Sequence, residues 1–361
     1  MQLSIKYRPK LFSEVIGQPV AVRILINSIK MQRVPSALLL SGAYGCGKTT
    51  LARLYAKALN CEALSGAGEP CQVCEACRAF KKDALLSVRE VDAASHSGVE
   101  DVRAFEDLLK FSIQGRYRVV ILDECHMMSK AAQAALLKVL EEPLANTIFI
   151  LVTTDPQKLE RTVRSRCLNL TLRSIGYDGM YQSIKLMLEA EGRQADEGFI
   201  SQLARAGNGS LRDTQQMLDS LLLSTEEVLT EAVLQGALSL VSSSVFKDLA
   251  HAFNSQSYAV WHDTIETWNR SGVDLALVFK EGVPKLLRDF SLCATRTETG
   301  VSLYSGITKS VLKDNLILSF DHIRYISKYW EEYMRLMQDT SYAKIVWDMF
   351  AISVCEYGSS V

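Results

Sequence analysis

Runs of uninterrupted apolar residues stand out in the first half of the chain. They occupy residues 37–40, 119–122 and 148–152, and polar residues bound each of them. A run without a polar member predicts a strand buried on both faces, as in a parallel sheet that helices cover on each side. Two more strands are indicated, at residues 86–91 and by the alternating Leu168, Leu170 and Leu172. We therefore predict an α/β domain with a parallel sheet.

Elsewhere the apolar residues recur every three or four positions, which is the spacing of one helix face. Such patterns cover residues 22–29, 51–59 and 129–142, the last ending before Pro143, which cannot continue a helix. From about residue 175 the pattern stays helical, and Ser210 is a suitable N-cap for a helix that starts there. The predicted domains are an α/β domain at 1–174, a small helical domain at 175–225 and an all-α domain at 226–361.

Charge and hydropathy narrow the class of protein. The 361 residues include 40 Lys and Arg and 41 Asp and Glu, which gives a net charge of -1. Because there is no overall positive field, any contact with nucleic acid must be local. No apolar run approaches the length of a membrane span, and the first residues lack the hydrophobic segment of a signal peptide. A cytosolic protein is expected.

A glycine-rich motif follows the first apolar run. Residues 42–49 read G-A-Y-G-C-G-K-T and fit G-x-x-x-x-G-K-[ST], between a predicted strand and a predicted helix. In such a loop, backbone N–H groups and the helix N-terminus bind phosphate oxygens. The predicted nucleotide contacts are Gly45, Cys46, Gly47, Lys48, Thr49 and Thr50. Lys48 would reach the β- and γ-phosphates and Thr49 would ligate Mg²⁺; the alternative is a glycine turn without this function.

The second apolar run ends in two acidic residues, Asp123 and Glu124. This is the Walker B pattern, in which Asp123 would hold Mg²⁺ and Glu124 would orient or deprotonate the attacking water. Ordinary acidic residues at a strand end are the alternative.

Four of the nine cysteines are grouped with the spacing of metal ligands. They are Cys61, Cys71, Cys74 and Cys77. Two overlapping C-x2-C pairs and a fourth thiol suit a tetrahedral zinc site with four thiolates, which leaves no open position for catalysis. Free or disulfide-bonded cysteines are the alternative.

Several motifs resemble the AAA+ clamp-loader ATPases. K-Y-R-P at 6–9, F-x-E-V-I-G-Q at 12–18 and D-A-A-S-x-x-G-V-E-D-x-R at 92–103 carry the likeness, and the cysteine insertion resembles the zinc module of the bacterial gamma/tau motor subunits. The resemblance implies that residues 175–225 form a lid and residues 226–361 an oligomerisation collar. It is strong over roughly 6–215 and weak beyond. It also implies that Tyr7, Arg8, Val15 and Ile16 border the adenine and ribose.

The resemblance also implies roles for three polar residues outside the two motifs. Thr154 matches sensor 1, which senses the γ-phosphate or the lytic water, and Arg212 in G-S-L-R-D matches sensor 2 on the lid. Arg166 in S-R-C matches the arginine finger that enters the ATP site of a neighbouring subunit. Judged from the residues alone, Arg166 is a surface arginine and Arg212 a salt-bridged one.

The implied function is that of an ATP-hydrolysing motor subunit that opens a sliding clamp and places it on primer–template DNA. Its partners would be other clamp-loader subunits, the clamp and DNA, and its cofactors ATP, Mg²⁺ and Zn²⁺. Candidate phosphate contacts are His96, Arg103, Lys138 and Lys158. Two alternatives stay open: another AAA+ machine, for branch migration or helicase loading, and a scaffold subunit that does not hydrolyse ATP.

Overall fold

The computed structural model describes residues 2–82, 84–93, 95, 115–225, 228–231, 233–234, 243–294, 319–337 and 342–358. The chain folds into two compact units, Met1–Thr230 and Glu231–Val361. His96 and Arg103 lie outside the described residues. The proposed domain boundaries at residues 174 and 225 stay predictions.

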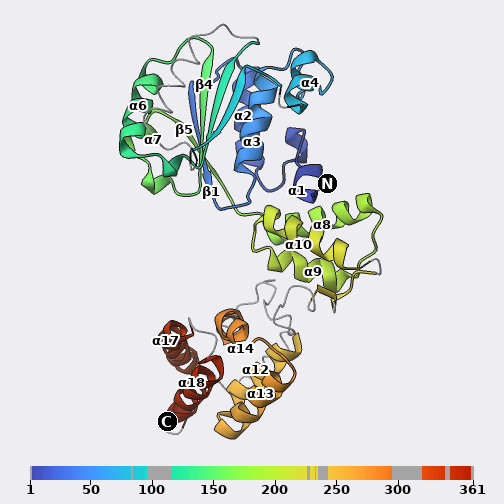
Figure 1. Ribbon diagram of the computed structural model, residues 1–361, viewed down its shortest axis with the longest axis vertical. Helices are drawn as coiled ribbons and strands as arrows, with labels where there is room; N and C mark the ends of the chain where they lie inside the picture. Colours follow the sequence, from blue (N-terminus) through green and yellow to red (C-terminus); the bar gives the residue numbers. More distant parts are fainter. Residues whose placement is uncertain are drawn as a thin grey trace. The chain divides into compact units, whose positions relative to one another are not determined.

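A five-stranded parallel sheet organises the first unit (Figure 1). Its strands are β1 (Ala37–Gly42), β2 (Val88–Asp92), β3 (Arg118–Asp123), β4 (Thr147–Thr153) and β5 (Leu168–Leu172). The strand order is β2-β3-β4-β1-β5, and each neighbouring pair is parallel. The predicted parallel sheet is confirmed, and the carboxyl ends of all five strands therefore meet at one edge.

The two faces of the sheet belong to different cores, which explains the uninterrupted apolar runs. Successive side chains of a strand point to opposite faces. In β1, Leu38 and Leu40 pack into one cluster, and Ala37 and Leu39 pack into the other. Strands β3 and β4 divide in the same way. A polar residue on either face would lose its contact with water, so both faces must be apolar.

Helices cover each face of the sheet. In the described stretches around the sheet, the helices are α1 (Leu3–Lys6), α2 (Pro19–Lys30), α3 (Lys48–Leu59), α4 (Glu75–Lys81), α6 (Lys130–Glu141) and α7 (Arg161–Arg164). Single 3-10 turns are η1 (Phe12–Glu14), η2 (Cys125–Met127) and η3 (Pro156–Lys158). Helices α2 and α3 cover one face, and α6 and α7 cover the other (Figure 1).

Three further helices of the first unit lie within the residues that the structure describes. They are α8 (Tyr177–Glu191), α9 (Glu197–Ala206) and α10 (Leu211–Ser224). The Ser210 hydroxyl accepts a hydrogen bond from the N–H of Asp213 at 3.3 Å, so the predicted N-cap is confirmed. The cap starts α10 immediately beside the glycine-rich loop.

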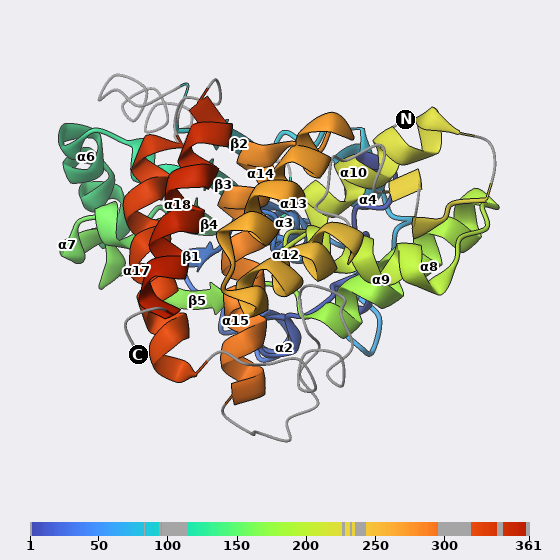
Figure 2. The same cartoon turned by 90° about the horizontal axis from the view of Figure 1, so that it is seen from below.

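The second unit is helical in its described residues, as predicted. Its elements are α12 (Ser243–Ser255), α13 (Tyr258–Arg270), α14 (Leu275–Leu277), η4 (Val278–Gly282), α15 (Val283–Ala294), α17 (Phe320–Leu336) and α18 (Ala343–Gly358). Figure 2 shows α17 and α18 side by side, and the two helices are in contact. None of the described helices is both long and apolar enough to cross a membrane.

Aromatic side chains fill the core of the second unit. Trp347 of α18 is fully buried, and its ring lies 4.9 Å from that of Phe279 and 5.8 Å from those of Trp261 and Trp268. Its indole N–H donates to the carbonyl of Leu275 at 2.8 Å. Trp347 thus joins α18 to α13 and to the α14–η4 stretch.

We expect Trp347→Ala to lower the free energy of unfolding of the second unit by about 3–5 kcal/mol, because it removes a fully buried ring and leaves a cavity. Chemical denaturation followed by circular dichroism measures the change. Tyr342→Ala is the control; that side chain is 57% exposed, so we expect a change within about 0.5 kcal/mol. Equal effects of the two substitutions would contradict this view of the core.

Candidate nucleotide site and cysteine cluster

The glycine-rich loop connects the end of β1 to the start of α3. Lys48, the first residue of α3, is only 6% exposed, and its ammonium donates to the carbonyls of Gly42 at 3.1 Å and Ala43 at 2.9 Å. These bonds hold the cation inside the curve of the loop. A buried ammonium at a helix N-terminus makes this an anion-binding position.

Gly45 allows the loop to approach the start of helix α10. Its φ is +71°, and its carbonyl accepts a hydrogen bond from the N–H of Leu211 at 3.1 Å. A Cβ at this position would lie 1.9 Å from the hydroxyl oxygen of Ser210. Only glycine fits both the left-handed backbone and the contact with the start of α10.

The sheet order brings Thr49 and Asp123 together. The Thr49 hydroxyl donates to Oδ2 of Asp123 at 2.8 Å, although 74 residues separate the two in sequence. A cavity of about 500 Å³ adjoins Asp123 and is also lined by Arg53 and Asp92. A hydroxyl and a carboxylate side by side at a phosphate-binding loop are oxygen ligands that suit Mg²⁺.

Glu124 follows β3 and is held by two polar side chains. Its backbone is left-handed, with φ at 46°, which is uncommon for a residue other than glycine. One carboxylate oxygen accepts from the Thr154 hydroxyl at 3.2 Å and lies 3.3 Å from Nδ1 of His126. The carboxylate therefore has a defined position at the same edge as Thr49 and Asp123.

The N-terminal arm, residues 7–18, contacts both helix α8 and the glycine-rich loop. The Tyr7 hydroxyl donates to Glu191 of α8 at 2.6 Å, and Lys6 Nζ binds the same carboxylate oxygen at 2.6 Å. These donors lower the pKa of Glu191. A Cβ added at Gly179 of α8 would lie 2.9 Å from Cγ2 of Ile16, so arm and helix are in close contact.

Buried Gln18 fastens the end of this arm to the glycine-rich loop. Its amide nitrogen donates to the carbonyls of Arg173 at 2.6 Å and Cys46 at 3.4 Å, while its oxygen accepts from the N–H of Arg173 at 3.1 Å. Val15 and Ile16, both half-buried, immediately precede this anchor. Burial also raises the pKa of the Cys46 thiol.

Arg212 of α10 lies next to the glycine-rich loop. Its guanidinium carbon lies 5.5 Å from the centre of the Tyr44 ring, the distance of a cation–π contact. The side chain is exposed at this position. Its charge is therefore next to the loop and accessible to a bound phosphate.

Arg166 lies at the surface after α7, and its contacts are with α6 and α7. Nη2 binds Glu141 at 2.5 Å and Nη1 donates to the carbonyl of Thr162 at 2.9 Å. The side chain is 36% exposed. The structure thus groups Lys48, Thr49, Asp123, Glu124 and Thr154, with Arg212 beside them, and places Arg166 among other partners.

The two candidate DNA contacts within the described residues are surface lysines. Lys138 is exposed on α6, and Lys158 lies in η3 with its ammonium 3.6 Å from Asp155. The Lys158 side chain is 62% exposed, so this ion pair stabilises the fold little.

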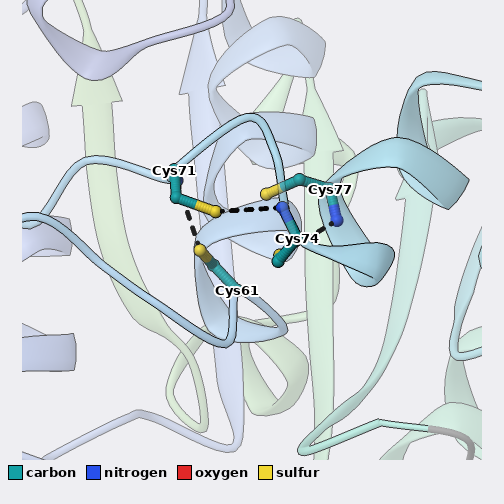
Figure 3. Close-up of side chains that lie close together, drawn as sticks. All are labelled: Cys61, Cys71, Cys74 and Cys77. Atoms are coloured by element: carbon teal, nitrogen blue, oxygen red, sulfur yellow. Dashed lines mark hydrogen bonds between the residues drawn. The ribbon is translucent and has the colours of Figure 1, made fainter.

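The four grouped cysteines converge as the spacing predicts (Figure 3). Their sulfur atoms all lie within 4.8 Å of one another. Four thiolates around a tetrahedral zinc ion with Zn–S bonds of about 2.3 Å lie about 3.8 Å apart, so the cluster fits this metal after small shifts. The N–H of Cys74 donates to the sulfur of Cys71 at 3.3 Å, and backbone donors lower the pKa of Cys71 to about 6.

A buried lysine lies beside the cysteine cluster. Lys57 of α3 is 6% exposed, and its ammonium donates to the side-chain oxygen of Gln72. Burial lowers the pKa of Lys57, and the nearby thiols of Cys77, Cys61 and Cys71 act in the opposite direction. A zinc ion with four thiolates carries two negative charges, so Lys57 would balance part of the charge of a filled site.

The sequence did not predict the contacts that His126, Gln18 and Lys57 make in the structure, nor the approach of Ser210 to Gly45. His126 stood in the acidic motif, two residues after Glu124, and this proximity was the one available signal. The partners of the other three lie 15 to 165 residues away in sequence, beyond the reach of a local pattern.

Comparisons with known proteins agree with these motifs. A family model described as DNA polymerase III, delta subunit matches residues 17–176. DNA polymerase III subunit tau/gamma of Haemophilus influenzae is 37% identical over 254 residues, which cover 70% of this chain and 37% of that protein. Subunit tau of Escherichia coli is 40% identical over 233 residues, which cover 64% of this chain and 36% of that protein.

A third relative matches along almost the whole chain. Subunit tau of Bacillus subtilis is 30% identical over 364 residues, which cover 97% of this chain and 62% of that protein. The chain thus spans about a third of the first two relatives and under two thirds of the third. Among solved structures, the RuvB Holliday junction branch migration motor of Thermotoga maritima matches with a TM-score of 0.47 and 20% identity, over 64% of this chain and 72% of that one.

Proposed function

Because this chain belongs to the family of DNA polymerase III gamma and tau subunits, we propose that it is an ATP-hydrolysing AAA+ motor subunit of a sliding-clamp loader. Its task would be to open the clamp and to place it on primer–template DNA. The contact between Thr49 and Asp123 carries the proposal, because it joins the phosphate-binding loop to the acidic strand end.

The residues divide the chemistry between them. Lys48 neutralises the β- and γ-phosphates, and Thr49 and Asp123 hold Mg²⁺, which neutralises charge on the phosphate oxygens. Glu124 orients the attacking water and accepts its proton, while Thr154 keeps the carboxylate in place through the 3.2 Å hydrogen bond. Arg212 binds the phosphates from the lid. Tyr7, Arg8, Val15 and Ile16 border the base and ribose.

Two other groups complete the proposed machine. Arg166 enters the ATP site of a neighbouring subunit, so the active site forms between subunits. Cys61, Cys71, Cys74 and Cys77 would hold Zn²⁺ with four thiolates, which would stiffen a short loop that lacks a core of its own.

The alternatives are less well supported. The relatives named above are replication subunits, which does not favour a branch-migration or helicase-loading machine. A scaffold subunit without hydrolysis has no need of Lys48, Asp123 and Glu124 in these positions. Reconstitution with candidate partner subunits, followed by ATPase assays with clamp and primed DNA, tests the proposal. An assembly without ATPase activity, stimulated or not, would make this chain a scaffold.

We expect the double substitution Lys138→Ala and Lys158→Ala to abolish the stimulation of ATPase by DNA while basal activity stays. Both ammonium groups would contact phosphates, and losing two contacts should lower the slope of log affinity against log salt by about 1–2. The measurement is the ATPase rate of the assembled complex with and without primed DNA. Lys185→Ala, an exposed lysine of α8, is the control. Stimulation that survives the double substitution would remove both residues from the DNA contact.

A further inference from the structure

The loop that carries the cysteines is bonded to the N-terminal arm through Glu69. Its two carboxylate oxygens accept hydrogen bonds from the N–H groups of Phe12 at 2.7 Å and Ser13 at 2.8 Å. Such bonds to a charged acceptor are stronger than neutral ones. They fix the backbone of the η1 turn, which lies directly before Val15 and Ile16.

Gln72 makes a second bridge between the same loop and the arm. Its amide nitrogen donates to the carbonyl of Lys10 at 2.8 Å, and its oxygen accepts from Lys57 of α3. Gln72 lies between Cys71 and Cys74 in sequence, so the positions of these two cysteines determine where its side chain points. The arm, the cysteine loop and the helix of the phosphate loop are therefore linked through one amide.

Gly68 presses the cysteine loop against α2. Its φ is +88°, and a Cβ there would lie 2.7 Å from Cγ2 of Ile26. Glu69 directly follows Gly68, and α2 begins at Pro19, directly after the arm. The contact of Gly68 with α2 therefore keeps Glu69 beside the arm. The cysteine loop thus touches both the arm and the helix that follows it.

The arm then continues to the candidate nucleotide site within a few residues. Val15 and Ile16 follow Phe12 and Ser13, whose N–H groups are bonded to Glu69. Gln18 then donates to the carbonyl of Cys46 in the glycine-rich loop. Gln18 is fixed at the end of the arm that is farther from the η1 turn. A shift of the η1 turn would therefore displace Val15 and Ile16, which lie between the turn and Gln18. In contrast, the side chain of Glu69 bonds to the arm, and the contacts of Lys48 and Thr49 are with Gly42, Ala43 and Asp123.

We propose that the four-cysteine module holds the base-side arm of the nucleotide site in position, with Glu69 and Gln72 as positioning residues. The inference rests on the proposed function, in which Val15 and Ile16 border the adenine. It assigns the module a role in recognising the nucleoside part of ATP. Binding of the phosphates is left to the glycine-rich loop.

The test compares ATP with inorganic tripolyphosphate, which lacks base and ribose. With Mg²⁺ present, isothermal titration calorimetry of the full chain gives both dissociation constants. We expect Glu69→Ala to weaken ATP binding about tenfold, as expected for the loss of hydrogen bonds to a charged group, and to change tripolyphosphate binding less than twofold. Glu69→Gln, which keeps one acceptor oxygen, should give an intermediate value.

Two controls separate positioning from damage to the module. Glu62→Ala removes an exposed glutamate of the same loop, whose contact is a 3.5 Å hydrogen bond from the N–H of Ala76, and should leave both constants unchanged. Zinc content, measured by atomic emission, should stay equal in wild type and Glu69→Ala.

The outcomes distinguish the inference from its premise. Selective loss of ATP affinity with zinc retained supports the inference. Unchanged ATP affinity in Glu69→Ala, or equal weakening of ATP and tripolyphosphate, overturns it while the proposed function stands. A wild-type chain that binds neither compound overturns the proposed function and the inference together.

Discussion

Replacing Arg166 with alanine is expected to lower ATP hydrolysis by the assembled complex by about 10³-fold or more, the range of an arginine finger supplied in trans. The guanidinium would neutralise charge that develops on the transferred phosphoryl group of a neighbouring subunit. In its own subunit Arg166 binds Glu141 and the carbonyl of Thr162 at an exposed position. An exposed ion pair contributes only about 0–1 kcal/mol, so releasing the side chain toward a neighbour costs little.

Steady-state ATPase assays on the isolated chain and on the assembly measure this effect. Arg166→Ala should leave the slow activity of the isolated chain unchanged. Glu124→Gln should lower the activity of both the isolated chain and the assembly, because Glu124 would act in the site of its own subunit. Glu141→Gln removes the ion pair, keeps the finger, and serves as the matched control. If a purified monomer hydrolyses ATP at the rate of the assembly and Arg166→Ala has no effect there, the intersubunit site is wrong.

Replacing Cys74 with serine is expected to remove zinc from the chain and to destabilise the first unit strongly. Structural zinc binds with an apparent free energy of roughly 10–16 kcal/mol, and this energy becomes available to folding only when all ligands are in place. Cys74 also caps α4, since its sulfur accepts from the N–H of Cys77 at 3.4 Å. The serine hydroxyl can still cap α4, so the substitution removes a zinc ligand and leaves the helix cap in place.

Atomic emission and thermal unfolding measure the two parts of this prediction. We expect about one zinc per wild-type chain and almost none in Cys74→Ser, as for other four-thiolate structural sites. Cys355→Ser, which changes a half-buried thiol of α18, is the control and should keep its zinc. Zinc that persists in Cys74→Ser at the wild-type amount would exclude the four-cysteine site.

Local pattern was sufficient for most of the elements. The apolar runs predicted strands at 37–40, 119–122 and 148–152, and the structure has strands that contain each of them. The runs are unambiguous because both faces of the sheet are buried, so no polar position interrupts them. The strand predicted at 86–91 is shifted, since β2 covers Val88–Asp92; this edge strand is partly exposed and its pattern is weaker.

From the residue pattern alone, the candidate site could be predicted only where its residues are neighbours in sequence; Thr154, Arg166 and Arg212 were expected from the resemblance. The glycine-rich loop and the cysteine spacing each place several ligands within a short stretch, so their identity was readable. Arg212 was expected on the phosphates by resemblance, but its contact with Tyr44 could be found only once α10 was placed against the loop. Arg166 shows the opposite case, because its partner Glu141 lies on a helix 25 residues earlier and no local pattern indicates the pair.

The sequence by itself determined the strand, loop and helix around Lys48, the acidic strand end and the cysteine group, because each depends on burial and backbone preference over a few residues. Tertiary structure decided the strand order that brings Thr49 to Asp123, the approach of Ser210 to Gly45, and the bonds from Glu69 and Gln72 to the arm. These contacts join residues 56 to 165 positions apart. Their geometry follows from how the helices and the sheet pack together, which no short stretch of the chain encodes.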